Sequence, residues 1–215
     1  MDQLETLKRE WQAREQEFPQ LTFQDIYQML LKKSSSMVKW IFYISIGELV
    51  LWTVLSFFIP ESSKEFTAEM GLTTTFRIVN GIGYVVFAIF IYLFYKNYQS
   101  IQVTDNVKSL MENILKTRRT VKYFVIYNIG TAIIFWAGVN VFYYMNKDRL
   151  YSLLSTMDEN YAAIPIETFT TVFFVGQLVG GLVLIGLLLL FYRLIYGILL
   201  KRLKTNYKEL KKMEI

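Results

Sequence analysis

One acidic residue, Glu48, stands inside an otherwise apolar stretch of the sequence, residues 41–59. The stretch is long enough to cross a bilayer as a helix, and Glu48 lies near its middle. A charged acid at the bilayer midplane costs on the order of 3 kcal/mol, so it must be neutral, paired or turned toward a polar interior. Glu48 is therefore either a proton- or cation-linked site or a hydrogen-bonding group that fixes helix packing.

Isolated polar side chains also interrupt the other apolar runs of the chain. Counting along each run puts Tyr84 and Gln177 at a depth similar to that of Glu48. By the same count, Asn128 lies nearer the inner end and Asn80 nearer the outer end. We therefore predict an intramembrane polar set of Glu48, Asn80, Asn128 and Gln177.

Two residue types that carry much of enzyme chemistry are absent, because the chain has no histidine and no cysteine. Histidine is the most common metal ligand and general base, and cysteine provides disulfides, iron–sulfur ligation and thiol catalysis. The sequence also contains no evident nucleophile–base pair or metal-ligand set. We therefore predict a non-enzymatic protein with no cofactor, no metal site and no catalytic residue.

Four apolar runs must position these polar residues. They cover residues 41–59, 78–95, 123–145 and 168–192, and Glu48 is their only charged side chain. Each run approaches or exceeds the roughly 20 residues that a membrane-spanning helix needs. A soluble helical bundle would need polar faces that these runs lack. The sequence therefore predicts an all-α membrane protein with four transmembrane helices.

Basic residues are distributed unevenly between the segments that connect the runs. The first, third and fifth non-membrane segments carry 19 of the 23 lysine and arginine residues. By the positive-inside rule, both termini are cytoplasmic, as in a multi-pass protein of a bacterial inner (plasma) membrane. The net charge of +5 is thus explained by contact with membrane lipid, and no nucleic-acid motif is visible.

Amphipathic segments precede and follow the apolar runs. Residues 2–17 form one such helix, and its apolar face could rest on neighbouring helices or dock a protein partner through Leu4, Leu7 and Trp11. Thr22 and Asp25 form a capping box that starts a second helix over residues 22–33. Thr104 is predicted to cap a third, and a basic helix closes the chain. Lipid headgroups are predicted to contact Lys32, Lys33, Lys201 and Arg202.

An internal repeat is visible at two offsets. At an offset of 83, residues 38–40 (VKW) match residues 121–123 (VKY), and at an offset of 97, residues 93–96 (LFYK) match residues 190–193 (LFYR). We therefore interpret the spans as two duplicated hairpins, with chance similarity between apolar helices as the alternative. The chain then divides into cytoplasmic amphipathic helices over 1–37, hairpins over 38–98 and 121–196, a cytoplasmic helix over 99–120 and a basic cytoplasmic helix over 197–215.

Small residues in two of the runs allow close approach of helices. Gly176 and Gly180 have the GxxxG spacing, and Gly81 and Gly83 lie close together in the second run. Such spacing is typical of helix packing in membranes. It predicts packing within the bundle or, alternatively, a homodimer.

The N-terminal third of the chain resembles a known family. The segments LKREW, QDIYQMLLKKSSSMVKW and ELVLW are similar to those of uncharacterised bacterial four-span inner-membrane proteins, most closely over residues 1–45. Some members carry the label carotene monooxygenase, which implies four iron-binding histidines, and we reject it because this chain has none. The N-terminal pattern also resembles the short cytoplasmic helices of membrane anti-sigma factors.

Two functional hypotheses follow from the sequence. The first is a regulatory or scaffold subunit that docks a cytoplasmic or membrane protein partner through its cytoplasmic helices. The alternative is a small transporter or channel that uses Glu48.

Overall fold

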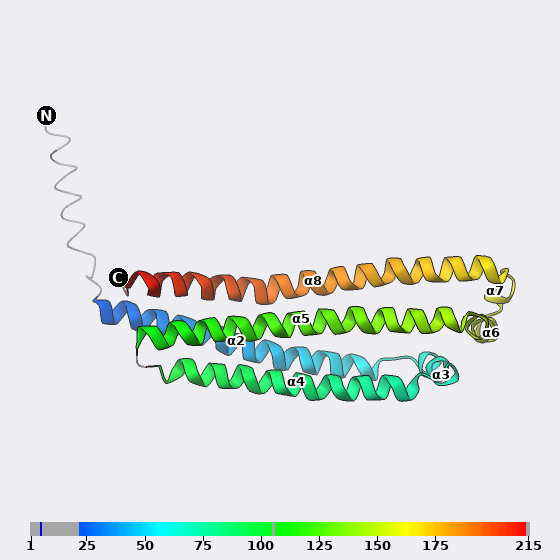
Figure 1. Ribbon diagram of the computed structural model, residues 1–215, viewed down its shortest axis with the longest axis horizontal. Coiled ribbons are helices and arrows are strands. Elements are labelled where there is room, and N and C mark those ends of the chain that lie inside the picture. The colour runs from blue at the N-terminus through cyan, green and yellow to red at the C-terminus, as the bar shows by residue number, and fades with distance from the viewer. Residues whose placement is uncertain (1–4, 6–21, 105, 214–215) are drawn as a thin grey trace.

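The computed structural model describes residues 5, 22–104 and 106–213, and the part of the chain that it describes is helical, with no strand. Four long helices lie side by side, and the short helices gather at one end of the bundle (Figure 1). The helices are α2 (Phe23–Phe57), α3 (Glu61–Glu69), α4 (Thr73–Gln102), α5 (Val107–Met145), α6 (Lys147–Met157), α7 (Glu159–Ala162) and α8 (Ile166–Met213).

The four long helices α2, α4, α5 and α8 are long and apolar enough to cross a membrane, which confirms the prediction of four such helices. They contain 35, 30, 39 and 48 residues. At 1.5 Å per residue, even the shortest is about 45 Å long, whereas the hydrocarbon core of a bilayer is about 30 Å thick. Each helix must therefore project beyond a membrane that it crosses.

The amphipathic segments are continuous with the apolar runs, which corrects the prediction of separate short helices. Residues 22–33 belong to the same helix as the first run, and the third and fourth runs are likewise continuous with residues 107–117 and 199–213. The basic segment at residues 32–36 contains no glycine or proline that would end a helix. Its Ser34 points into the protein and is fully buried.

One of the two predicted helix caps is confirmed. Thr22 and Asp25 form the capping box, each accepting a backbone N–H of the other at 3.2 and 3.0 Å. Thr104 is not a cap, since the side chain of Asn106 accepts from the backbone N–H of Ser109 and begins α5. Thr104 is instead buried in the loop between α4 and α5, where its hydroxyl donates to the carbonyl of Ser100 in α4 at 2.6 Å and accepts from the Asn113 amide of α5 at 3.0 Å.

The short helices close the end of the bundle where the hairpins turn. Leu150 of α6 is fully buried at this end. Gly71 joins α3 to α4 with φ +79°, a conformation that a side chain would strain. A small core forms here around Leu150, and it contains Met70, Leu72, Tyr143 and Phe169.

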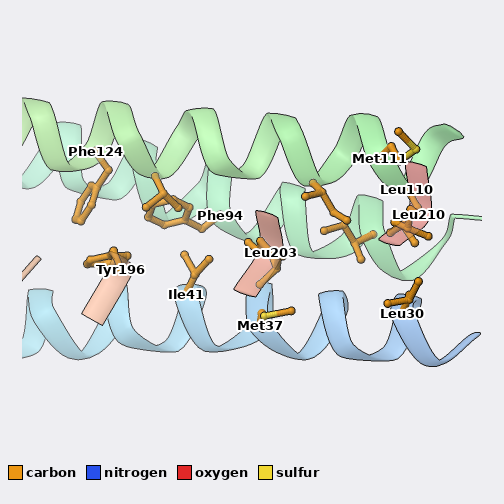
Figure 2. Packing of buried hydrophobic residues seen from close by; sticks show 14 of the residues in the cluster. Leu30, Met37, Ile41, Phe94, Leu110, Met111, Phe124, Tyr196, Leu203 and Leu210 are labelled. Atoms are coloured by element: carbon orange, nitrogen blue, oxygen red, sulfur yellow. The ribbon is translucent and has the colours of Figure 1, made fainter. Parts of the chain in front are cut away.

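The main core lies toward the other end, where α2 begins and α8 ends (Figure 2). Ile41, Leu110, Ile114, Leu203 and Leu210 are all fully buried there. The described amphipathic segments therefore pack against one another through these residues. Phe23, Ile26 and Leu115 of these faces are nevertheless exposed, so the faces are only partly covered within the described chain.

Candidate functional site

Glu48 is hydrogen-bonded to two tyrosines of α8. The hydroxyl of Tyr192 donates to Oε1 of Glu48 at 2.5 Å, and the hydroxyl of Tyr196 donates to Oε2 at 3.1 Å. Tyr192 and Tyr196 are four residues apart and therefore share one face of α8. Glu48 is only 3% exposed, so both of its oxygens find partners inside the protein rather than in solvent.

The phenol rings of these tyrosines pack against Phe124 of α5, which is fully buried. Five rings surround Phe124 in tilted, edge-to-face contacts with centroid distances of 5.1–6.3 Å. They belong to Phe87, Phe90, Phe94, Tyr192 and Tyr196. Figure 2 shows Phe94, Phe124 and Tyr196 facing one another. All four long helices meet here, since Glu48 comes from α2, and we call Glu48, Phe94, Phe124, Tyr192 and Tyr196 the Glu48 cluster.

The position of Glu48 along the bundle depends on which apolar run is used to count it. Along the first apolar run it is central, but its partner Tyr192 is the last residue of the fourth run and directly precedes Arg193. Phe124 likewise follows Lys122 by two residues. Along α8, Glu48 therefore lies level with the inner end of the fourth apolar run, although it is central along the first run.

A cavity of about 500 Å³ lies between α2, α4, α5 and α8, directly beside the Glu48 cluster. Tyr192 belongs to both, because it lines the cavity and donates to Glu48. The rest of the lining is mainly apolar or aromatic, including Trp52 and Phe135, and it also includes the polar side chains of Asn80 and Asn128. We call this space the central cavity.

The predicted polar set is only partly brought together. Asn80 and Asn128 line the central cavity, and the Asn128 amide donates to the backbone carbonyl of Phe124 at 2.8 Å. Gln177 lies elsewhere, beside Trp136 in a second cavity of about 470 Å³ between α5 and α8. None of the three is a hydrogen-bond partner of Glu48. Gln177 precedes Tyr192 by fifteen residues on α8, so at 1.5 Å per residue it lies about 22 Å from the level of Tyr192 and Glu48.

The tyrosine partners of Glu48 were missed by sequence reasoning. Tyr192 lies at the end of an apolar run and Tyr196 beyond it, so counting residues from the run ends placed both away from Glu48. Their spacing of four residues was the available signal, because it puts two phenol groups on one helical face.

The four glycines predicted for helix packing make no close contact with another helix of this chain. A methyl group built on Gly81, Gly83, Gly176 or Gly180 would meet no atom within 4 Å. The close approach is made instead at Gly181, where a methyl group would collide with the indole of Trp136. The GxxxG spacing is thus not used for packing between helices of this chain, because its glycines line the cavity beside Trp136.

The four basic residues predicted to contact lipid headgroups do not share one site. Lys33 and Arg202 line one groove, whereas Lys32 lines another and Lys201 is absent from both linings. Leu4, Leu7 and Trp11 lie outside the described residues. Within the described residues, no group of three or more acidic, histidine or cysteine side chains could hold a metal ion.

In the described part of the chain, four helices that could span a membrane and a polar cluster between them define the class of this protein. The chain belongs to the family described as a domain of unknown function, DUF8845, whose model matches residues 24–215. No curated protein and no solved structure matches it.

Proposed function

We propose that the protein is a non-enzymatic membrane carrier that binds a small molecule in the central cavity. The observation that carries this proposal is the double role of Tyr192, which lines the cavity and holds Glu48. A molecule in the cavity would touch a side chain that is hydrogen-bonded to the buried acid. A ligand in the cavity would in this way affect the Glu48 cluster, where all four helices meet.

The lining of the central cavity supports a mainly apolar ligand with one or two polar groups. Small-molecule sites are concave and apolar, with a few polar groups that fix orientation, and they commonly hold 300–1,000 Å³. The volume of about 500 Å³ lies in that range. Asn80, Asn128 and Tyr84 offer the polar contacts, and the Tyr84 hydroxyl lies 3.3 Å from that of Thr53.

Filling the central cavity tests the carrier proposal. Gly83 lines the cavity and Gly81 does not. A methyl group built on either glycine would meet no atom within 4 Å, so both positions have room for a side chain. Gly83→Leu is expected to weaken binding of the fluorescent aromatic amine 1-aminoanthracene by at least about tenfold, the effect of losing about 1.4 kcal/mol of contact. Gly81→Leu is the matched control and should bind the probe as the natural chain does. Equal binding by both variants would contradict the proposal.

Docking of a protein partner is the second candidate function. The observation in its favour is that the long helices project well beyond a bilayer and that α8 ends in a strongly basic segment. We place the docking site on residues 1–21, which include the predicted anchors Leu4, Leu7 and Trp11. Deleting residues 1–20 separates the two candidates, since a carrier keeps its binding of 1-aminoanthracene and a docking subunit loses a partner that co-purifies with the full chain.

The proposed location is the inner membrane of a bacterium, with both termini in the cytoplasm. The charge distribution supports this orientation, and so does the position of the start of α2 and the end of α8 at the same end of the bundle (Figure 1). Ser62 in α3 and Lys108 in α5 are both exposed and lie toward opposite ends. In intact cells, an impermeant maleimide should label Ser62→Cys and should reach Lys108→Cys only after permeabilisation. The reverse pattern would invert the orientation.

Duplication of a hairpin is also proposed, and burial supports it for the first helix of each hairpin. At the offset of 83, Ser34 and Thr117 are both fully buried. Val38 and Val121 are also both fully buried, as are Ile41 and Phe124. The second helices do not follow this pattern, because α8 turns a different face toward the core than the offset of 97 requires. A homodimer through the open face at Gly176 and Gly180 stays a prediction.

A further inference from the structure

A groove with a volume of about 400 Å³ lies between the first half of α2 and the last third of α8. Lys33 from α2 and Arg202 from α8 line it together, and no acidic residue is part of the lining. Neither cation forms an ion pair with another described residue. We call this space the basic groove, and within the described chain no acid compensates its two charges.

The walls of the basic groove combine hydroxyl groups with apolar surface. Ser36 and Thr205 provide exposed hydroxyls, and Met37 and Leu199 provide apolar contacts. Trp40 completes the lining, is 59% exposed and directly precedes the first apolar run. Tryptophan is enriched at the level of lipid headgroups. The groove therefore lies at the boundary where polar and apolar surroundings of the bundle meet.

The floor of the basic groove holds the two helices together. The Asn206 amide of α8 donates to the hydroxyl of Ser34 in α2 at 3.1 Å, and both residues are buried. This buried bond fixes α2 against α8 one residue away from Lys33 and one turn away from Arg202. The backbone positions of the two cations are consequently set before any ligand arrives.

We propose that the basic groove binds the phosphate headgroup of one anionic phospholipid. Basic pockets between transmembrane helices on the cytoplasmic side suit such headgroups, and arginine matches phosphate with two parallel hydrogen bonds. The apolar contacts of Met37, Trp40 and Leu199 continue into the lipid-facing surface, so acyl chains have a place to lie. A soluble phosphate would leave that apolar wall unused. The proposal rests on the orientation proposed above and is independent of the carrier function.

The structure separates four basic residues that the sequence does not distinguish. Lys32 and Lys201 are neighbours of Lys33 and Arg202 in the chain, but neither lines the basic groove. Lys32 faces a different hollow, whose lining includes Asp25. The pairs Lys33/Arg202 and Lys32/Lys201 therefore carry the same charge on the same helices, and only one pair converges on the groove.

Native mass spectrometry of the full chain in mild detergent tests the proposal, with phosphatidylglycerol as the probe and phosphatidylcholine of the same acyl chains as reference. One phosphatidylglycerol should bind at least about tenfold more tightly than phosphatidylcholine. The double variant Lys33→Gln/Arg202→Gln should weaken that binding roughly 30-fold, since each basic residue near a membrane surface contributes about 1 kcal/mol. Lys32→Gln/Lys201→Gln should stay within about twofold of the natural chain because screened charges act weakly at a distance.

Three results would overturn the proposal. Equal weakening in both double variants would mean diffuse attraction to the basic surface rather than a site. Equal affinity for phosphatidylcholine would remove the role of the negative charge. Competition by glycerol 3-phosphate at the affinity of the whole lipid would identify a soluble phosphate site instead. All substituted side chains are exposed, so circular dichroism of both variants should match that of the natural chain.

Discussion

Replacing Phe124 with alanine is expected to lower the free energy of unfolding by about 3–5 kcal/mol, the usual cost of deleting a fully buried phenylalanine side chain. Phe124 is fully buried and touches five aromatic rings, all in the tilted geometry that aromatic pairs prefer. These rings come from α4 and α8, and they cannot close the space left by the lost ring without moving both helices. Titration with dodecyl sulfate, followed by far-ultraviolet circular dichroism, measures the change.

Tyr123 is the matched control for this variant. It is the preceding residue of the same helix and also aromatic, but 60% of it is exposed. Tyr123→Ala should change the unfolding free energy by no more than about 0.5 kcal/mol, as is usual for exposed positions. If the two variants unfold alike, Phe124 is not the packing centre of the bundle.

The architecture was predictable because it depends on composition along single segments. Four apolar runs predict four membrane-length helices without knowledge of their neighbours, and the capping box at Thr22 and Asp25 is a signal confined to four residues. The continuity of α2 through residues 32–36 was harder to predict. A charged segment suggests a break, but lysine and serine do not end a helix unless glycine or proline accompanies them.

The candidate site was less predictable because it depends on how helices are placed relative to one another. Glu48 could be identified as a lone acid in an apolar run, but its partners could not, since counting depth assumes that every run starts at the same level. The contact with Tyr192 shows that the level of the fourth run differs from that of the first. Gln177 was misplaced for the same reason, whereas Asn80 and Asn128 lie beside the cluster because they line the central cavity.

Removing both hydroxyls that hold Glu48 is expected to cost about 2–4 kcal/mol of unfolding free energy. Tyr192→Phe/Tyr196→Phe keeps the rings that pack on Phe124 and deletes only the two donors. Single polar contacts within membranes average well under about 2 kcal/mol, but a buried carboxyl group that loses both tyrosine donors also bears a cost of desolvation, about 1–3 kcal/mol. The same dodecyl sulfate titration measures the loss.

A third substitution distinguishes the cost of a buried carboxyl group without its tyrosine donors from a general loss of packing. Adding Glu48→Leu to Tyr192→Phe/Tyr196→Phe removes the buried acid together with its donors, so the triple variant should be more stable than the double variant. Glu48→Leu alone should be destabilised, because it leaves two buried hydroxyls without an acceptor. Only interacting residues give such non-additive effects. If the effects of Glu48→Leu and of the two tyrosine substitutions simply add, the hydrogen bonds do not hold α2 against α8. A ligand in the central cavity could then not affect Glu48 through Tyr192.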